Sequence, residues 1–167
     1  MKINKAHTFA FSYHLPSLYD REDYKLALED IERQIRMCIY WGFTDYIVGM
    51  QRDNDMLIAL AVSEVIKKLK KEKDIPIRLF VAWPWKKIET YWDKERVDIY
   101  KKINRRADEV FYVSKEQGRA ASWMIDNASG LISDGYYEEE YGVIREAFEY
   151  AWSKIQNHED YYINFPD

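Results

Sequence analysis

Cysteine, glycine and long apolar runs are scarce in this chain. Of its 167 residues, one is cysteine, Cys38, and six are glycine. A single cysteine excludes an internal disulfide framework and is typical of a reducing compartment, so we expect a cytoplasmic protein in which Cys38 packs in the core. No apolar run reaches the roughly 18 residues of a membrane span, and the start "MKINKAHTFAF" lacks the features of a signal peptide. We therefore expect no membrane association.

Excess positive charge is also missing. The formal net charge is −4, which argues against a general nucleic-acid binder because such proteins usually carry a basic face. The chain is 47% hydrophobic and 16% aromatic, enough to bury a core without help. We expect one domain over residues 1–155, followed by a carboxyl-terminal tail over 156–167 that packs back through its aromatic side chains.

Five short β-rich runs alternate with amphipathic stretches along the chain. The predicted strands are Thr8–Tyr13, Asp45–Met50, Ile75–Trp83, Asp108–Ser114 and Ser129–Gly135. Each is followed by a stretch with helical periodicity, the first of which places Leu28, Ile31, Ile35 and Cys38 on one face and ends at Gly42. Strands that alternate with helices pair in parallel through right-handed crossovers. The pattern predicts an open, doubly wound, Rossmann-like α/β fold with five mainly parallel strands and helices on both faces.

Ligands of such sheets bind beyond the carboxyl ends of the strands, where the strand order reverses. The candidate ligand-binding residues are therefore those that close or follow the strands. They are Ser12, Tyr13, His14, Gly49, Gln51, Asp55, Pro84, Trp85, Ser114 and Asp134.

Two of these candidates have alternative interpretations. His14 could act as a general base or donate a hydrogen bond to a ligand, or it could be a satisfied polar residue at a strand end. Asp55 stands just inside a predicted helix and could hold a ribose or act as an acid, or it could cap the helix. The other histidines, His7 and His158, lie away from the strand ends, so we expect no metal cluster.

A phosphate cradle is not expected at the last helix. Such a cradle needs glycine-rich backbone and a positive field at a helix start. The sequence instead places Glu138, Glu139 and Glu140 before the final helix. Three carboxylates suit the helix dipole but repel a phosphate.

The motifs at the strand ends resemble those of the YpsA-like branch of the SLOG superfamily, Rossmann-like domains related to LOG phosphoribohydrolases and DprA-type proteins. The family pattern Thr-Gly-His-Arg-Pro is similar to Ser12–Pro16, with the histidine and proline kept. The pattern Gly-Met-Ala-x-Gly-x-Asp is similar to Gly49–Asp55, with its two ends kept. The resemblance extends over Phe9 to Trp152 and includes four further matches, which are Pro84, Trp92, the segment "RRADEVFYVS" and the run Met124-Ile125-Asp126.

The resemblance implies a domain that binds a nucleotide or nucleotide-derived small molecule without catalysis and without a cofactor. Tyr13, which replaces the family's glycine, would stack on a base. SLOG domains occur in bacterial and phage genomes, so a bacterial or phage protein is implied as well.

Two alternatives stay open. The first is an interaction protein that kept the fold without a ligand and self-associates through the aromatic residues of "DGYYEEEYG" and "EDYYINFPD". The second is a phosphoribohydrolase or N-glycosidase in which Asp55 or Glu116 supplies a carboxylate. The glycine-rich stretch of the family's hydrolases is missing, which favours a binding domain over an enzyme.

Overall fold

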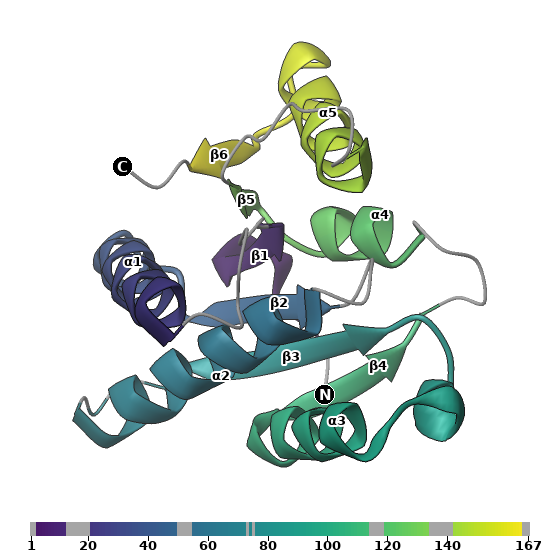
Figure 1. Cartoon of the computed structure of the whole chain (residues 1–167). Helices are drawn as coiled ribbons and strands as arrows, with labels where there is room; N and C mark the ends of the chain where they lie inside the picture. The colour runs from purple at the N-terminus through teal and green to yellow at the C-terminus, as the bar shows by residue number, and fades with distance from the viewer. Residues whose placement is uncertain are drawn as a thin grey trace.

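The chain forms a three-layer α/β structure, seen here in a computed structural model (Figure 1). The structure describes residues 3–12, 21–49, 55–72, 74, 76–113, 119–133 and 142–164, and only the backbone of residues 21, 23, 55, 119 and 142–145. The strands are β1 (Thr8–Ser12), β2 (Asp45–Gly49), β3 (Arg78–Trp83), β4 (Glu109–Tyr112), β5 (Gly130–Ser133) and β6 (Tyr162–Asn164). The helices are α1 (Arg21–Tyr40), α2 (Asp55–Glu72), α3 (Lys94–Arg106), α4 (Arg119–Asp126) and α5 (Gly142–Gln156), with short 3-10 turns η1 (Lys5–His7) and η2 (Ile88–Tyr91).

All six strands are parallel, in the order β4-β3-β2-β1-β5-β6. This confirms the predicted doubly wound, Rossmann-like fold. The expected number of five strands was wrong by one, because the segment expected to be a tail contributes β6. Tyr162 and Ile163 pair with Gly130 and Leu131 of β5. Three residues are too few to produce a recognisable alternation, so the sequence pattern gave no sign of this strand.

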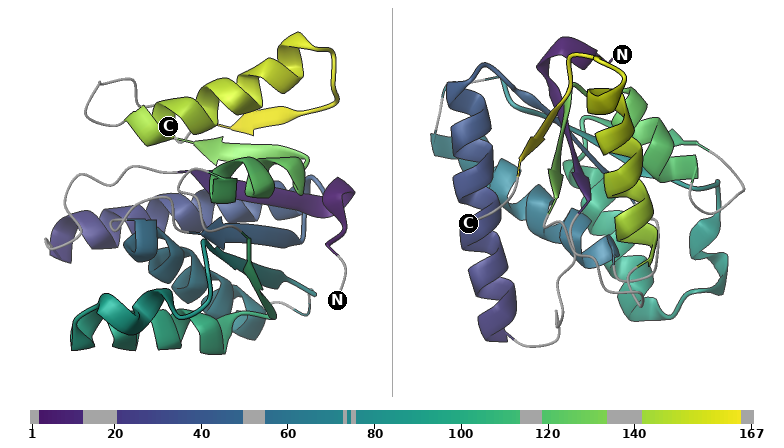
Figure 2. Two further views of the ribbon diagram at one scale, coloured as in Figure 1. Left: turned by 90° about the vertical axis from the view of Figure 1, so that its right-hand side faces the viewer. Right: turned by 90° about the horizontal axis from the view of Figure 1, so that it is seen from above.

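The helices cover the sheet from both sides. The right-hand view of Figure 2 shows α1 on one side of the strands and α5 on the other. Helices α2 and α3 lie on the α1 side, and α4 packs with α5. Side chains of β1 alternate between the layers, since Phe9 and Phe11 join the core cluster of the α1 side while Ala10 joins that of the α5 side. Parallel strands covered in this way read as continuous apolar runs, as the sequence showed.

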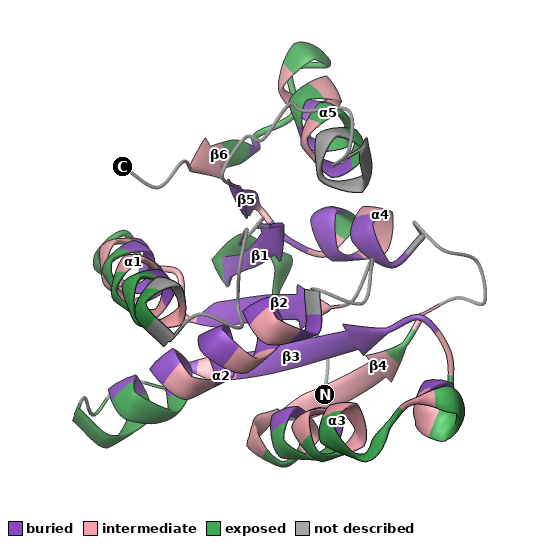
Figure 3. Ribbon diagram, in the orientation of Figure 1, coloured by how far each residue is buried: buried purple, intermediate pink, exposed green. Residues whose placement is uncertain are grey.

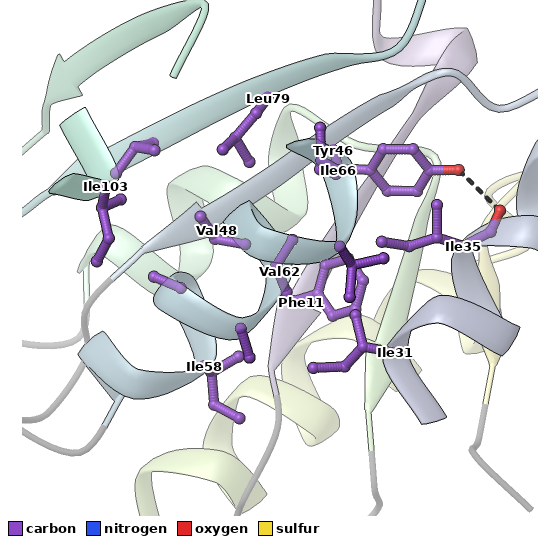
Figure 4. Packing of buried hydrophobic residues seen from close by; sticks show 14 of the residues in the cluster. Phe11, Ile31, Ile35, Tyr46, Val48, Ile58, Val62, Ile66, Leu79 and Ile103 are labelled. Carbon is purple, nitrogen blue, oxygen red and sulfur yellow. Dashed lines mark hydrogen bonds between the residues drawn. The ribbon is translucent and has the colours of Figure 1, made fainter. Parts of the chain in front are cut away.

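The larger core lies between the sheet and helices α1 to α3 (Figure 4). Ile31 and Ile35 of α1 are fully buried there, as the helical spacing predicted. Tyr46 of β2 is also fully buried, and its hydroxyl donates to the carbonyl of Phe43 at 2.8 Å. Cys38 is buried, and burial raises the pKa of its thiol to about 12. Its expected role in core packing is confirmed.

A glycine ends α1. Gly42 has φ 97°, a left-handed conformation that glycine adopts without strain. The amide of Phe43 donates to the carbonyl of Cys38 at 2.9 Å, and the amide of Gly42 donates to that of Ile39 at 3.0 Å. These two hydrogen bonds form the Schellman pattern and reverse the chain into β2.

A buried ion pair ties β2 to β3 at the amino-terminal end of the sheet. Arg78 donates from Nε to Oδ1 of Asp45 at 3.0 Å and from Nη2 to Oδ2 at 2.5 Å. The Asp45 side chain is 3% exposed and that of Arg78 is 30% exposed. The hydrogen bond to Asp45 raises the pKa of Arg78. The carboxylate thus depends on Arg78 for its compensation, whereas the guanidinium also reaches water.

We expect removal of Arg78 to cost more stability than removal of the Asp45 charge. Replacing Arg78 by Met keeps much of the side-chain volume but leaves a buried carboxylate without its counter-charge, which should lower the free energy of unfolding by about 3 kcal/mol. Asp45→Asn leaves a partly solvated guanidinium and should cost about 1 kcal/mol. Urea unfolding of both variants measures the difference. A larger loss for Asp45→Asn would contradict the assignment of Asp45 as the dependent partner.

A second polar cluster joins α4 to α5. Lys154 Nζ lies 2.9 Å from Oδ1 of Asp126, and the Tyr150 hydroxyl donates to the same oxygen at 2.6 Å. Burial raises the pKa of Asp126, but the hydrogen bonds from Tyr150 and Lys154 outweigh burial and hold it below its ordinary value. The hydrogen bond to Asp126 and burial together raise the pKa of Tyr150 to about 12.

The lowered pKa of Asp126 gives the α4–α5 contact a defined pH dependence. A carboxyl group whose pKa is lower in the folded chain stabilises the fold above its unfolded pKa of about 4, and this stabilisation is lost as the pH falls through the folded value. Asp126→Asn should therefore reduce stability at neutral pH and show a smaller further loss on acidification than the parent protein. Thermal unfolding from neutral to acidic pH tests this. Parallel pH profiles for the two proteins would contradict it.

Candidate functional site

The order of the strands reverses between β1 and β5. From β1 the chain proceeds outward through β2 and β3 to β4, and α4 then returns it to β5, on the other side of β1. Helix α1, which follows β1, covers one face of the sheet, and α5, which follows β5, covers the opposite face. Segments that leave neighbouring strands toward opposite faces diverge, and this divergence makes the crevice in which doubly wound folds bind ligands. We call the carboxyl ends of β1 and β5 the switch point.

Two serines end the strands at the switch point. Ser12 of β1 and Ser133 of β5 are register partners, and strand spacing places their backbones about 4.8 Å apart. By alternation from Ala10 and Leu131, which belong to the core cluster of the α5 side, both side chains point to the layer of α4 and α5. The switch point therefore presents two adjacent hydroxyl groups on one face.

The hydroxyl group of Ser12 is buried and unsatisfied. Ser12 is 5% exposed, and its Oγ atom has no hydrogen-bond partner within the described part of the chain. Buried polar groups are normally paired, and an unpaired one costs about 1–3 kcal/mol. An unsatisfied hydroxyl at the place where the fold offers a crevice is the strongest local indication of a binding site in the described residues.

Gly49, which ends β2 beside β1, has a packing reason to be glycine. A Cβ atom there would lie 2.6 Å from the carbonyl oxygen of Ala82 and 2.8 Å from Sδ of Met124. The missing side chain lets β3 and α4 approach the end of β2. Packing against β3 and α4 therefore explains why residue 49 is glycine, without any contact to a ligand.

Pro84 and Trp85 lie further from the switch point. They follow β3, which is two strands from β1, or about 10 Å. Pro84 is buried, and Trp85 is half-buried against the core cluster on the α1 side. The indole of the neighbouring Trp83 is also engaged, donating to Oδ1 of Asn104 at 2.7 Å. The structure thus brings together Ser12 and Gly49 from the predicted set, and it places Pro84 and Trp85 at a distance.

Several predicted site residues lie outside the described residues. These are Tyr13, His14, Gln51, Ser114 and Asp134, together with the alternative acid Glu116. Asp55 is the first residue of α2, as predicted, and only its backbone is described. The strand before Ser114 is the edge strand β4, three strands from β1, whereas the strand before Asp134 is β5, at the switch point itself.

Sequence reasoning missed Ser133. The candidate chosen near the end of the fifth strand was Asp134, one position after Ser133, which is the last residue of β5. The sequence signal was present, since "GLIS" ends on a polar residue after three apolar or small ones. What could not be read from the sequence was that β5 is the neighbour of β1.

Electrostatically, the switch point differs from the opposite end of the sheet. The final residues of β1, β2, β3 and β5 are Ser12, Gly49, Trp83 and Ser133, none of which is charged. Asp45 and Arg78 begin β2 and β3 at the other end. Among the residues that the structure describes, no group of three or more histidine, cysteine or acidic side chains could hold a metal ion. In the same residues, no helix combines the length and the apolar character that crossing a membrane requires.

No protein-family model matches the chain, and no curated protein matches it in sequence.

The packing explanation of Gly49 predicts a loss of stability on Gly49→Ala. The new Cβ would meet a backbone oxygen of β3 that is held in the sheet, so we expect the free energy of unfolding to fall by about 1–3 kcal/mol. Gly42→Ala is the matched control, because its Cβ would meet no atom within 4 Å and the change is strained only through φ. That control should cost about 1 kcal/mol. If Gly49→Ala were as stable as the parent protein, Gly49 would need another explanation.

Proposed function

We propose that this chain is a non-catalytic binding domain for a nucleotide or a nucleotide-derived small molecule, held at the switch point between β1 and β5. The observation that carries the proposal is the buried, unsatisfied hydroxyl of Ser12, which lies where the strand order reverses. The resemblance of Ser12–Pro16 and Gly49–Asp55 to SLOG motifs supports the same place, because both motifs begin at the ends of adjacent strands.

The side chains at the switch point suit the ribose or the base of a nucleotide better than its phosphate. Ser12 supplies a hydroxyl that can both donate and accept, and Ser133 lies next to it. Ribose hydroxyls and base edges also both donate and accept. The strand ends contribute no cation that would balance a phosphate, and the sequence places three glutamates before α5. The ligand's phosphate, if it has one, would then point away from the sheet.

The interaction-protein alternative has less support. It depended on exposed aromatic residues in two segments, "DGYYEEEYG", of which 134–141 lie outside the described residues, and "EDYYINFPD" at the end of the chain. Tyr161 of that segment is buried, with its ring 6.0 Å from Nζ of Lys154, so it packs the chain rather than presenting a surface. Tyr162 is exposed but borders a pocket that is discussed below.

The proposal predicts a variant that loses binding without losing stability. Ser12→Ala should weaken binding of the preferred nucleotide about three- to tenfold, because a buried hydrogen bond to the ligand is removed. The free energy of unfolding without ligand should stay within about 0.5 kcal/mol of the parent, because Ser12 Oγ makes no hydrogen bond in the described structure. Isothermal titration with a panel of mono-, di- and cyclic nucleotides, combined with urea unfolding, measures both quantities.

Ser153→Ala is the matched control for this experiment. Ser153 lies on α5, and its hydroxyl donates to the carbonyl of Tyr150 at 2.6 Å, one turn earlier in the same helix. The Ser153→Ala variant should bind the preferred nucleotide as tightly as the parent protein does. The proposal fails if no nucleotide of the panel gives a binding heat, or if the two serine variants bind equally well.

A further inference from the structure

A second pocket lies on the opposite face of the sheet from the switch-point serines. Its volume is about 400 Å³, within the usual range of ligand sites. Figure 1 shows β6 at the edge of the sheet, beside α5. The pocket lies on the α1 side, since its lining includes Phe9 of the core cluster on that side and Trp41 and Phe43, which follow α1. The described residues that line it are Phe9, Trp41, Phe43, Tyr162, Ile163 and Asn164.

The aromatic wall of this pocket is built by specific contacts. The rings of Phe9 and Phe43 meet edge-to-face at 4.6 Å, and those of Phe43 and Tyr162 meet edge-to-face at 6.4 Å. Phe9 lies over Gly130, where a Cβ atom would come within 2.2 Å of the ring. The glycine in β5 therefore sets the position of Phe9. Trp41 and Tyr162 remain 53% exposed at the rim, a large apolar area to leave in water.

One polar group in the lining can give a ligand direction. The side-chain amide of Asn164 donates from Nδ2 to Oε1 of Gln34, which fixes its orientation. That hydrogen bond uses the amide nitrogen, and the carbonyl oxygen is the acceptor that this side chain offers to a ligand. Figure 3 shows β6 less buried than β1 and β5, consistent with an open approach to this amide.

We propose that this pocket binds an uncharged, planar heteroaromatic small molecule. Four aromatic rings supply stacking and edge-to-face partners for a flat ring. None of the described residues that line the pocket is charged, so the described lining gives an ionised ligand no counter-charge for its lost hydration. The Asn164 oxygen selects a ligand with a ring N–H or amino donor. This ligand is held independently of the switch point, because Ser12 and Ser133 point to the other face of the sheet.

Fluorine NMR of protein labelled with fluorotryptophan tests the proposal directly. The Trp41 resonance is assigned with Trp41→Phe, and the probes are adenine and indole, both neutral, planar and able to donate from a ring N–H. We expect a saturable shift of the Trp41 resonance with at least one of them. Cyclohexanecarboxamide, which is uncharged but not aromatic, and indole carboxylate, which is charged, should bind more weakly.

Variants connect the signal to the pocket. Tyr162→Ala removes a rim ring and should weaken binding about two- to tenfold. Tyr91→Ala is the matched control, since Tyr91 is 94% exposed on η2, outside the pocket lining, and this change should have no effect. Circular dichroism checks that both variants fold. If Tyr162→Ala does not fold, Asn164→Ala tests the pocket independently through the same Trp41 shift.

The outcomes separate this proposal from that of the switch point. Ser12→Ala should leave the Trp41 shift unchanged, whatever its effect on nucleotide binding. The pocket proposal is overturned if neither adenine nor indole gives a saturable Trp41 shift up to its solubility limit. It is also overturned if cyclohexanecarboxamide binds as tightly as the aromatic probes, or if Tyr162→Ala and Asn164→Ala both bind like the parent.

Discussion

The handedness of the crossovers is the constraint on which the rest of this structure depends. When parallel strands are joined by right-handed crossovers, the direction in which the chain adds strands decides which face of the sheet the connecting helix covers. Helices cover one face while strands are added in one direction, and the other face after the direction reverses. Here the reversal comes after β4, and α4 carries the chain back across the sheet to β5. The two helical layers, the two hydrophobic clusters and the switch point all follow from that one return.

The two ends of the sheet are chemically different. The amino-terminal end holds the Asp45–Arg78 ion pair, and there the Asp108 carboxylate accepts from the Leu79 amide and from Lys70, each at 2.8 Å. Charged side chains thus hold β2 in register with β3, and β3 in register with β4. The carboxyl-terminal end has serine, glycine and tryptophan instead. Charge therefore stabilises the sheet at one end, and the end that the fold rule assigns to ligands has two hydroxyl groups, those of Ser12 and Ser133.

The sequence predicted the layers of this fold well because their signal is local. Apolar runs showed the five strands β1 to β5, and a 3.6-residue spacing placed Ile31 and Ile35 on the buried face of α1. The edge strand β6 was missed because its three residues become a strand only through pairing with β5. The aromatic residues next to it were expected to pack back, or in the alternative to form a contact surface; the structure buries Tyr161 and exposes Tyr162.

The site could be predicted only in part, for a related reason. Residues that end strands can be read from the sequence, but which ends are neighbours depends on the strand order. Ser12 and Ser133 are far apart in the chain and become register partners only because β5 lies beside β1. The second pocket shows the same limit, because it combines Phe9, Trp41 and Tyr162 from three distant segments. Neither Gly49 nor Gly130 could be assigned a packing role until the atoms around it were placed.

The central claim is that the carboxyl ends of β1 and β5 form the ligand site. Backbone amide NMR during titration with the nucleotide panel locates any binding residue by residue. The account predicts that the largest shifts occur at Ser12 and Ser133 and decrease toward Thr8 and Gly130, at the amino-terminal ends of the same strands. Shifts centred on the amino-terminal end of the sheet, or no shifts at Ser12 and Ser133 with any nucleotide, would contradict it.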